Sequence, residues 1–505
     1  MQVESKIQNP TSAIVIGAGL GGLAAAIRLA ARGFSVTILE KNANVGGKVN
    51  HVSANGYGFD TGASLLTMPH VLRELFESAN RRLEDYLELV KLDPICRYFW
   101  SDGATFDASS DLTQTEANIR EIEPRDVANF KKFLTDSQRK YEVSERTFLS
   151  HALNDLPKLL KPKFARDLLA ISSLQTLDSH VKGYFKSAKF QQLFNRFATY
   201  NGSSPYQSPA TFALIPFVEF GLGAWYVKGG IYKIPQALSR LANELNVEIK
   251  TNCEVEKIIV ENKKAVGVKL KNGETLKSDF VVSNADAIET YRALIDEKSR
   301  PSFSDKKLEK FEPSCSGFVL LLGAKQKFET LAHHNIFFSD DYKLEFDELF
   351  KQKRPASNPT IYVCATSRTD ATQSPANHEN LFVLINAPFT SSATDWKTEA
   401  KQYRDLVIKK LETLGLRGLE ESLDYEQIIT PEDFETKYRA NKGSIYGISS
   451  NKWSSVFSRP ANKSTNVKNL YFVGGATHPG GGMPLVLLSA KMTTDLILDF
   501  GLIDN

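Results

Sequence analysis

The feature that most constrains the fold is a glycine-rich loop between an apolar strand and a helix near the N-terminus. Residues 13–16 (AIVI) are fully apolar, which predicts a buried parallel strand. Gly17, Gly19 and Gly22 follow at once in GxGxxG spacing. The apolar residues of segment 20–33 are largely spaced by three or four, which predicts a helix that ends at a glycine. A strand, a glycine turn and a helix in this order predict an α/β fold built around a parallel sheet.

A second apolar strand, residues 34–39, completes a βαβ unit and is followed by Glu40. The glycines permit close backbone approach to a phosphate, and the helix N-terminus offers unpaired N–H groups with a partial positive charge. Glu40, about 20 residues after the loop, can accept hydrogen bonds from both hydroxyls of a ribose. The whole unit predicts a dinucleotide site, and the acid disfavours the 2′-phosphate of NADP.

The residues after Glu40 separate FAD from NAD. Residues 41–48 (KNANVGGK) resemble the glycine doublet that continues the adenosine and pyrophosphate site in a large class of flavoproteins. Residues 58–65 (GFDTGASL) resemble the FDxG turn of the same class. NAD dehydrogenases lack both features, so the cofactor is predicted to be FAD. Taken alone, Gly46 and Gly47 would indicate only a surface turn.

Size and charge narrow the class of protein further. A chain of 505 residues exceeds the roughly 250–300 at which one hydrophobic core stops growing, so two or more lobes are expected. Its 62 basic and 59 acidic residues give a net charge of +3, which argues against nucleic acid as a partner. The four cysteines form no CxxC pair, and neither a signal peptide nor a membrane span is predicted. A folded cytoplasmic protein is therefore expected.

Six further segments, in a fixed order along the chain, carry a family resemblance. They are residues 225–245, 252–258, 281–286, 314–323, 331–342 and 469–484. Together with the N-terminal motifs they resemble the bacterial carotenoid (phytoene) desaturase family, whose members are FAD-dependent, and the resemblance covers almost the whole chain. Residues 61–66 (TGASLL) and 226–232 (YVKGGIY) are similar to the branch of 1-hydroxycarotenoid 3,4-desaturases.

The resemblance implies an α/β fold with a discontinuous cofactor domain. A Rossmann-type FAD-binding domain is expected to combine residues 10–74, 225–290 and 465–505. Residues 75–224 are expected to form a helix-rich region that faces the substrate and the membrane. Residues 291–464 are expected to form a mixed α+β substrate domain.

FAD is expected, through the resemblance, to contact residues of all three segments of its domain. The predicted cofactor-binding residues are Gly17, Gly19, Leu20, Gly22, Glu40, Gly47, Lys48, Ser64, Leu65, Val255, Asn284, Gly475, Gly482 and Met483. From the residues alone, Val255 could equally be an ordinary core valine and Asn284 a turn-forming asparagine.

Hydrophobic patterns predict the local structure around the later members of this set. Residues 249–258 and 265–270 alternate, which predicts two strands around a turn, with Val255 in the first strand. Residues 470–473 predict a last buried strand of the FAD domain, and residues 485–498 predict a helix. The glycines between them would let the backbone approach the cofactor, and the helix N-terminus would face the flavin.

Two stretches bear on the substrate. Residues 211–227 (TFALIPFVEFGLGAWYV) are nearly all apolar, which predicts either the wall of a long apolar tunnel or ordinary core. In residues 153–177 leucines alternate with basic residues. This pattern is typical of a helix that lies in a membrane interface, and equally of a helical lid with one solvated face. These basic residues are Lys158, Lys161, Lys163 and Arg166. Peripheral membrane association is expected, because a long hydrocarbon must be collected from lipid.

No catalytic residue is predicted. Glu219 is the only charge in the apolar stretch, and an acid in such surroundings would have a raised pKa useful for proton handling. Pairing with Lys228 or exposure to solvent would explain Glu219 equally well. His333 and His334 are adjacent, so on a strand they would face opposite sides and share no metal ion. No metal site is predicted.

The leading functional hypothesis is FAD-dependent desaturation of an acyclic carotenoid, with 3,4-desaturation of a 1-hydroxycarotenoid as the specific reaction. A hydride would pass to flavin N5 while a proton leaves the adjacent carbon, which forms a new C=C bond. The alternatives are a phytoene desaturase, an amine or porphyrinogen oxidase, and a lipid-binding carrier of the GDP-dissociation-inhibitor type. The bond that reacts, the number of steps, the electron acceptor and the oligomeric state stay open.

Overall fold

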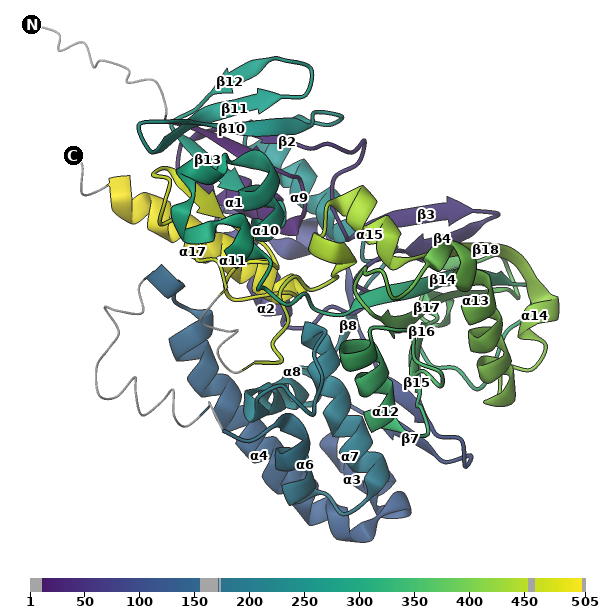
Figure 1. The fold of residues 1–505 in the computed structure, drawn as a ribbon. Coiled ribbons are helices and arrows are strands. Elements are labelled where there is room, and N and C mark those ends of the chain that lie inside the picture. Colours follow the sequence, from purple (N-terminus) through teal and green to yellow (C-terminus); the bar gives the residue numbers. More distant parts are fainter. Residues whose placement is uncertain (1–10, 155–170, 172–173, 453–458, 502–505) are drawn as a thin grey trace, which may run out of the picture.

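The computed structural model of the protein describes residues 11–154, 171, 174–452 and 459–501. These residues form a parallel sheet flanked by helices, a large mixed sheet and a group of helices (Figure 1). The N-terminal and C-terminal ends of the described chain lie on the same side, beside the parallel sheet. The α/β fold class predicted from the glycine loop is confirmed.

The parallel sheet has the strand order β19-β13-β1-β2-β9. Its strands are β1 (Ser12–Ile16), β2 (Ser35–Leu39), β9 (Glu248–Lys250), β13 (Phe280–Ser283) and β19 (Leu470–Phe472). In register, Ala13 lies opposite Val36 of β2 on one side and Phe280 of β13 on the other. The strands therefore come from all three segments expected to build the FAD domain.

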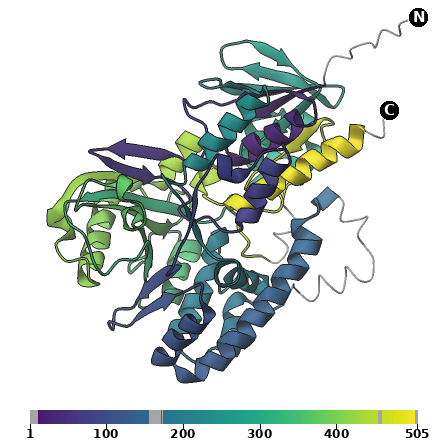
Figure 2. The same cartoon turned by 180° about the vertical axis from the view of Figure 1, so that it is seen from behind.

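Three helices pack beside one another against this sheet. They are α1 (Leu20–Ala30), α9 (Lys233–Glu244) and α17 (Met483–Gly501). Figure 2 shows α1 and α17, which begin more than 400 residues apart in sequence, side by side. Their apolar faces share one core, to which Leu23, Leu238 and Leu487 contribute. Helix α1 is followed by Gly33 at φ +88°, as the sequence predicts.

A three-stranded antiparallel sheet adjoins the parallel one, with the order β10-β11-β12. Its strands are β10 (Val255–Glu261), β11 (Lys264–Leu270) and β12 (Thr275–Lys277). The prediction of one continuous strand over residues 249–258 is wrong. The chain leaves β9, which pairs with β2, and starts β10 in a different sheet, because the two halves of the alternating pattern have different partners.

The mixed sheet has seven strands in the order β18-β14-β17-β16-β15-β6-β7. They are β6 (Cys96–Phe99), β7 (Thr105–Ala108), β14 (Ser316–Ala324), β15 (His334–Phe337), β16 (Ile361–Cys364), β17 (Glu379–Ala387) and β18 (Leu423–Ile429). Helix α13 (Trp396–Thr413) shares a core with this sheet. Strands β6 and β7 come from the region expected to be helix-rich, so that region also contributes to the sheet.

The helical group lies below both sheets in Figure 1. It contains α3 (Leu112–Ile122), α4 (Val127–Ser144), α6 (Leu177–Tyr184), α7 (Ala188–Asn195) and α8 (Ile215–Phe220). Aromatic side chains dominate its core, including Phe130, Phe133, Phe185 and Phe194. The basic segment with Lys158, Lys161, Lys163 and Arg166 lies outside the described residues. Among the helices that the structure describes, none is both long enough and apolar enough to cross a membrane.

Shorter elements connect these parts. β3 (His51–Ala54) and β4 (Tyr57–Asp60) form a hairpin, and β5 (Leu89–Lys91) pairs antiparallel with the distant β8 (Trp225–Val227). Further α-helices among the described residues are α2 (Pro69–Glu77), α10 (Ala287–Leu294), α11 (Asp305–Leu308), α12 (Tyr342–Asp347), α14 (Leu419–Ser422) and α15 (Pro431–Tyr438).

Candidate functional site

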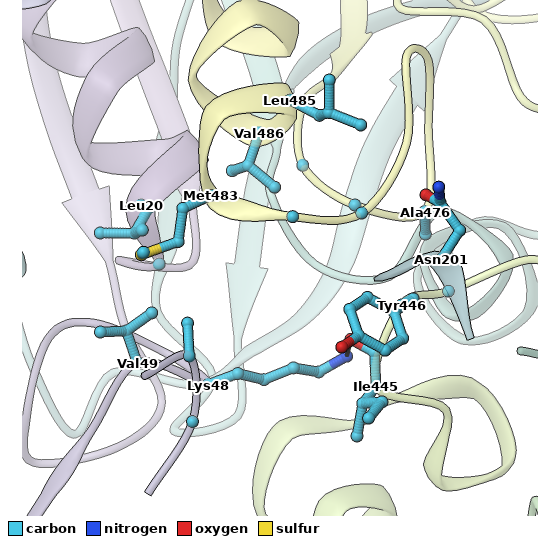
Figure 3. Close-up of a pocket in the computed structure, with 18 of the residues that line it drawn as sticks. Leu20, Lys48, Val49, Asn201, Ile445, Tyr446, Ala476, Met483, Leu485 and Val486 are labelled. Atoms are coloured by element: carbon cyan, nitrogen blue, oxygen red, sulfur yellow. Dashed lines mark hydrogen bonds between the residues drawn. The ribbon is translucent and has the colours of Figure 1, made fainter. Parts of the chain in front are cut away.

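A cavity of about 630 Å³ lies where the parallel sheet, the mixed sheet and the helical group meet. Its walls include the loop after β1, the loop before α17, residues of the helical group and side chains of the mixed sheet. Figure 3 shows one end of it, where Leu20 of α1, Met483 of α17 and Lys48 approach the same space. This volume is in the range of cavities that hold cofactors and small ligands.

The glycine loop after β1 is packed too closely for side chains. A Cβ atom on Gly22 would lie 2.1 Å from the carbonyl oxygen of Gly17, and one on Gly19 would lie 2.8 Å from Nδ2 of Asn284. Gly17 has φ +93°, a conformation that favours glycine. The loop thus leads tightly from β1 into α1 and turns the N-terminus of α1 toward the cavity, as a phosphate site requires.

Glu40 lies at the end of β2, 5% exposed, at the edge of the cavity. Its two carboxylate oxygens accept hydrogen bonds of 2.8 Å from the backbone N–H groups of Ala18 and Asn42. These bonds fix the carboxylate beside the glycine loop. Each oxygen keeps lone-pair capacity for a further donor, as binding of a ribose needs.

The glycine doublet at positions 46 and 47 packs directly against the glycine loop after β1. The Gly46 amide donates to the carbonyl of Ala18 at 2.8 Å, and a Cβ on Gly47 would lie 3.2 Å from Cα of Gly19. Both glycines have positive φ. The surface-turn alternative is therefore wrong, because the doublet forms part of the cavity wall.

Lys48 spans the cavity to a loop nearly 400 residues later. Its Nζ donates to the carbonyls of Ser444 at 2.8 Å and Ile445 at 3.2 Å (Figure 3). Burial lowers the pKa of Lys48 to about 8, and the charge of Asp286 opposes this shift. Near neutral pH the lysine is therefore mostly a cation at the cavity wall.

The glycines before α17 form the opposite wall. Gly482 has φ +109°, and a Cβ there would meet no atom within 4 Å, so its backbone faces open space. Gly475 packs against Gly481, where a Cβ would lie 3.3 Å from the Gly481 Cα. Helix α17 begins at Met483, and its N-terminus points into the cavity. The predicted strand, glycine loop and helix are all present.

Thirteen of the fourteen predicted residues line this cavity. They are Gly17, Gly19, Leu20, Glu40, Gly47, Lys48, Ser64, Leu65, Val255, Asn284, Gly475, Gly482 and Met483. Gly22 lies behind the wall, where the missing side chain allows α1 to pack against the strand–loop junction. Asn284 Nδ2 donates to the Gly17 carbonyl at 3.4 Å, so this asparagine supports the loop. The contacts of these residues with a cofactor stay predictions.

The sequence reasoning missed a group of wall residues that only the tertiary fold brings together. Asn201, from the helical group, and Tyr446 lie near the glycine loop before α17 (Figure 3). Arg459 is buried and donates to the Pro479 carbonyl at 2.5 Å and to Ser450 Oγ at 2.8 Å. Burial lowers the pKa of Arg459 to about 10. None of these residues stands in a recognisable local motif, so sequence pattern offered no signal for them.

The remainder of the cavity wall is mostly apolar. It is formed by Phe148, Phe212, Leu214, Ile215, Val218 and Ile336, among others. Part of the apolar stretch 211–227 therefore lines the cavity, while Ala213, Phe220 and Ala224 of the same stretch belong to the helical core. One part of this stretch is therefore cavity wall, and the other part is ordinary core.

Polar side chains also stand in this wall, and two of them belong to one hydrogen-bonded cluster. Arg196 and Tyr200 both line the cavity, and both contact Glu219, which lies behind them and is 1% exposed. Arg196 Nη2 donates to the Glu219 carboxylate at 3.2 Å and to the Tyr98 hydroxyl at 2.8 Å, and the Tyr200 hydroxyl donates to Glu219. Glu219 is therefore paired with Arg196. The suggested partner Lys228 pairs with Glu88 instead.

A second polar chain leads from the cavity into the mixed sheet. Ser64 Oγ lies 2.6 Å from the Tyr362 hydroxyl, which lies 2.7 Å from Nδ1 of His334. The prediction that His333 and His334 face opposite sides is wrong. His333 precedes the first residue of β15, so strand alternation does not separate the two rings, whose centroids lie 4.5 Å apart. Burial lowers the pKa of both histidines.

The donor set fits FAD. The close-packed glycine loop, the open backbone at Gly482 and the helix N-termini of α1 and α17 suit phosphate and flavin groups, and Glu40 suits a ribose. Val255 begins β10 and lies 4% exposed at the Glu40 end, where an adenine would pack. The carboxylate of Asp286, which also lines the cavity, caps α10 by accepting hydrogen bonds from the backbone N–H groups of Ile288 and Glu289.

Comparisons with known proteins agree with this geometry. The model of the family "Flavin containing amine oxidoreductase" matches residues 20–498. The chain is 40% identical to the 4,4′-diapolycopene oxygenase of Methylomonas sp. over 491 residues, which cover 96% of this chain and 97% of the relative. It is 36% identical to the 4,4′-diaponeurosporene oxygenase of Staphylococcus aureus strain Mu50 over 488 residues, covering 96% and 97%.

Solved structures share the fold at lower identity. An oxidoreductase from Methanosarcina mazei has a TM-score of 0.65 and 17% identity, covering 96% of this chain and all of that one. A putrescine oxidase variant has a TM-score of 0.66 and 12% identity, covering 97% and 100%. Such likenesses show the architecture alone. From the matching family model and the relatives of 36–40% identity, the chain belongs to the flavin-containing amine oxidoreductase family, within its branch of bacterial carotenoid-modifying enzymes.

Proposed function

We propose that this flavoenzyme oxidises an acyclic carotenoid, with insertion of oxygen as the favoured outcome. The observation that carries the proposal is the cavity described above, in which a wall suited to FAD continues into an apolar wall suited to a polyene. The names of the 36–40% identical relatives, both carotenoid oxygenases, support oxygen insertion. Membership of an oxidoreductase family argues against the carrier alternative, and the relatives argue against an amine substrate.

The chain's own residues would bind and orient the polyene. Bound FAD would supply two-electron chemistry and a site at which O2 can react. Apolar side chains such as Phe212, Ile215 and Ile336 would hold the chain of the substrate and exclude water. Arg196 and Tyr200 are the polar groups of this wall nearest to Glu219, and they could bind an oxygen atom on the substrate or product.

The second candidate is the 3,4-desaturation of a 1-hydroxycarotenoid. The pair Arg196 and Tyr200 favours it, because a guanidinium and a phenol in an apolar wall suit a substrate that already carries a hydroxyl. Phytoene, which has no polar atom, would give Arg196 and Tyr200 no hydrogen-bond partner beyond the Tyr98 hydroxyl and Glu219.

The two reactions differ in their electron balance. Inserting one oxygen atom of O2 into a C–H bond gives an alcohol and water, and it consumes two electrons from a donor such as a reduced nicotinamide. Removing a hydride and a proton from adjacent carbons gives a C=C bond, and it delivers two electrons to an acceptor such as a quinone. One reaction therefore needs a reductant and the other an oxidant.

The experiment is a product analysis under isotopically labelled oxygen. The FAD-loaded enzyme is incubated in liposomes with 4,4′-diapolycopene, phytoene or a 1-hydroxylated acyclic carotenoid, with either a reductant or a quinone, under 18O2. We expect products of the unhydroxylated polyene that carry 18O. Loss of two hydrogens without label, from the hydroxylated substrate and with quinone, would overturn oxygen insertion and establish desaturation. No turnover of any carotenoid would reject both.

Peripheral membrane contact is part of this proposal, because the substrate is dissolved in lipid. Co-sedimentation with liposomes of neutral and of anionic lipid tests it. We expect binding that is stronger with anionic lipid, since the segment with Lys158, Lys161, Lys163 and Arg166 is basic. A protein that stays in the supernatant with both lipids would contradict it.

A further inference from the structure

Three metal-ligating side chains meet inside the mixed sheet, outside the flavin wall. They belong to His333, His334 and Cys364, and their ligand atoms all lie within 4.8 Å of one another. The strand register explains the meeting, because His334 of β15 lies directly opposite Cys364 of β16. His333 stands immediately before β15, and its ring turns to the same side. The three residues are 5%, 2% and 1% exposed.

In both imidazoles Nδ1 has a hydrogen-bond partner and Nε2 has none among the described residues. His333 Nδ1 lies 2.6 Å from Oγ1 of Thr369, and His334 Nδ1 lies 2.7 Å from the Tyr362 hydroxyl. Among the described residues, Nε2 of each ring is buried and has no hydrogen-bond partner. If each Nδ1–H donates to its hydroxyl, each Nε2 presents a bare lone pair, which is the state of a metal-binding histidine.

A purely structural role explains this arrangement poorly. Two buried nitrogen lone pairs without donors lose their hydration and gain nothing in return. The ring of Tyr226 lies beside His333, with the ring centroids 4.9 Å apart, but the Tyr226 hydroxyl donates to Asp370 and not to the imidazole. A cation bound between the rings and the thiol would satisfy both nitrogens at once.

We propose that His333, His334 and Cys364 bind one thiophilic d10 cation, Cu(I), as a buried site that holds Tyr362 in place. One thiolate and two neutral imidazoles around Cu(I) carry no net charge, whereas Zn(II) would leave a positive charge in the interior. Ligand atoms of a trigonal site with bonds of about 2.0–2.3 Å lie about 3.5–4 Å apart, so the present side chains need to close by roughly 1 Å. Rotation of the side chains can provide this.

The site would act on the cavity through one hydrogen-bonded path. With its proton on Nδ1, the His334 ring donates to the Tyr362 hydroxyl, and this hydroxyl lies 2.6 Å from Ser64 Oγ at the cavity wall. A ligand bond at Nε2 fixes both the ring orientation and the tautomer of His334. Tyr362 is then a positioned side chain, and His334 with its ion is the positioning group. This inference does not depend on which carotenoid is the substrate.

The experiment is a Cu(I) competition titration of the FAD-loaded protein under reducing, anaerobic conditions, with bicinchoninate as the competing chelator. We expect about one Cu(I) bound per chain. X-ray absorption of the loaded protein is expected to show one sulfur and two nitrogen ligands. Failure to compete for Cu(I), or a coordination shell without sulfur, would overturn the proposal. Retention of Zn(II) but not Cu(I) would overturn the assigned ion.

Variants separate this site from two of the other thiols. Cys364→Ser is expected to abolish stoichiometric Cu(I) binding, while Cys315→Ser, which alters an equally buried thiol elsewhere, retains it. Cys253→Ser controls for the half-buried thiol at the cavity. Equal loss of binding in Cys315→Ser and Cys364→Ser would contradict the assignment.

A milder change keeps the test valid if Cys364→Ser fails to fold. Thr369→Val removes only the hydroxyl that holds His333 Nδ1, and Thr369 does not line the cavity. Loss of such an outer partner typically weakens metal binding 10–100-fold. We expect a weakening of that size with an unchanged flavin spectrum. Unchanged Cu(I) affinity in Thr369→Val, together with no sulfur ligand in the wild-type spectrum, would reject the site.

Discussion

At the scale of single residues, the absence of a side chain shapes the cofactor wall as much as any functional group does. The clearest case is Gly22, where a Cβ would meet the backbone carbonyl of Gly17 at 2.1 Å. A backbone oxygen cannot rotate away as a flexible side chain can. The loop geometry therefore depends on this glycine although Gly22 does not line the cavity.

Gly22→Ala is expected to weaken FAD binding by roughly tenfold or more, about 1.4 kcal/mol, since the loop must move away from the helix. The measurement is the dissociation constant of FAD from the refolded apoprotein, followed by flavin fluorescence. The control is Gly183→Ala in α6, where a Cβ would meet nothing within 4 Å. Equal flavin affinity in both variants would show that the loop tolerates the methyl group.

The pair Arg196 and Glu219 is a second residue-scale feature with a measurable consequence. Both side chains are buried, and removing one partner leaves the other charged without compensation. Such losses typically cost about 3–5 kcal/mol. We expect Arg196→Met and Glu219→Gln each to destabilise the protein in urea denaturation, and the double variant to recover part of the loss.

The exposed pair of Lys228 and Glu88 is the matched control for this cycle. Exposed ion pairs contribute about 0–1 kcal/mol, so Lys228→Met should change the free energy of unfolding little. Strictly additive losses in the Arg196 and Glu219 double variant would contradict a coupled pair.

At the scale of elements, the loop before α17 is tied to the helical group by one histidine. His478 is fully buried, and its Nε2 lies 3.0 Å from the carbonyls of both Phe148 and His151, while its ring contacts Phe148 edge-on. Nε2 must therefore carry the proton, and Nδ1 is buried without a partner among the described residues. Burial lowers the pKa of His478 to about 4.

This lowered pKa predicts that acid weakens the fold. Between about pH 6.5 and pH 4 the unfolded chain binds a proton at His478 and the folded chain does not, so the free energy of unfolding falls as pH falls. The full loss from this residue is about 3 kcal/mol. Urea denaturation at pH 7.5, 6 and 4.5 measures it, and His478→Gln is expected to show a shallower dependence. An identical pH dependence in both proteins would refute the link.

At the same scale, the local sequence pattern predicted which segments form helices and strands, but not which strands pair with one another. Strand, loop and helix around Gly17 follow from neighbouring residues, because the phosphate loop is a local structure. The predicted strand over residues 249–258 failed because β9 pairs with β2, some 210 residues earlier. His333 and His334 were separated on the assumption that both lie in the strand, yet β15 begins at the second histidine.

At the scale of the whole molecule, cavity residues contributed by distant loops lay beyond sequence reasoning. Lys48 was predicted to belong to the cofactor site, but its bonds to Ser444 and Ile445 depend on how the mixed sheet docks against the parallel one. Arg196 and Tyr446 carry no motif and enter the wall only through tertiary packing. The parallel sheet, in contrast, contains strands from all three segments that the family resemblance assigned to the FAD domain, while the bounds of that domain stay predictions.

The cavity joins segments from the whole length of the chain, so FAD is expected to stabilise the entire fold. Free FAD at 100 times its dissociation constant should add about 2.7 kcal/mol to the free energy of unfolding. The thermal midpoint of the apoprotein with increasing FAD measures this. FMN, which lacks the adenosine that Glu40 and Val255 are predicted to hold, should give a smaller shift. Equal shifts with both flavins would contradict the assigned adenosine end.

The strand order β19-β13-β1-β2-β9 means that the parallel sheet cannot be completed until the C-terminal strand β19 has been synthesised. Gly475 leaves the ribosome 458 residues after Gly17, a delay on the order of 20–90 seconds at about 5–20 residues per second. Until then the apolar face of α1 lacks α17, and the phosphate loop lacks its opposite wall. If FAD contacts both walls as predicted, the complete flavin site can form only after the C-terminal segment has been synthesised.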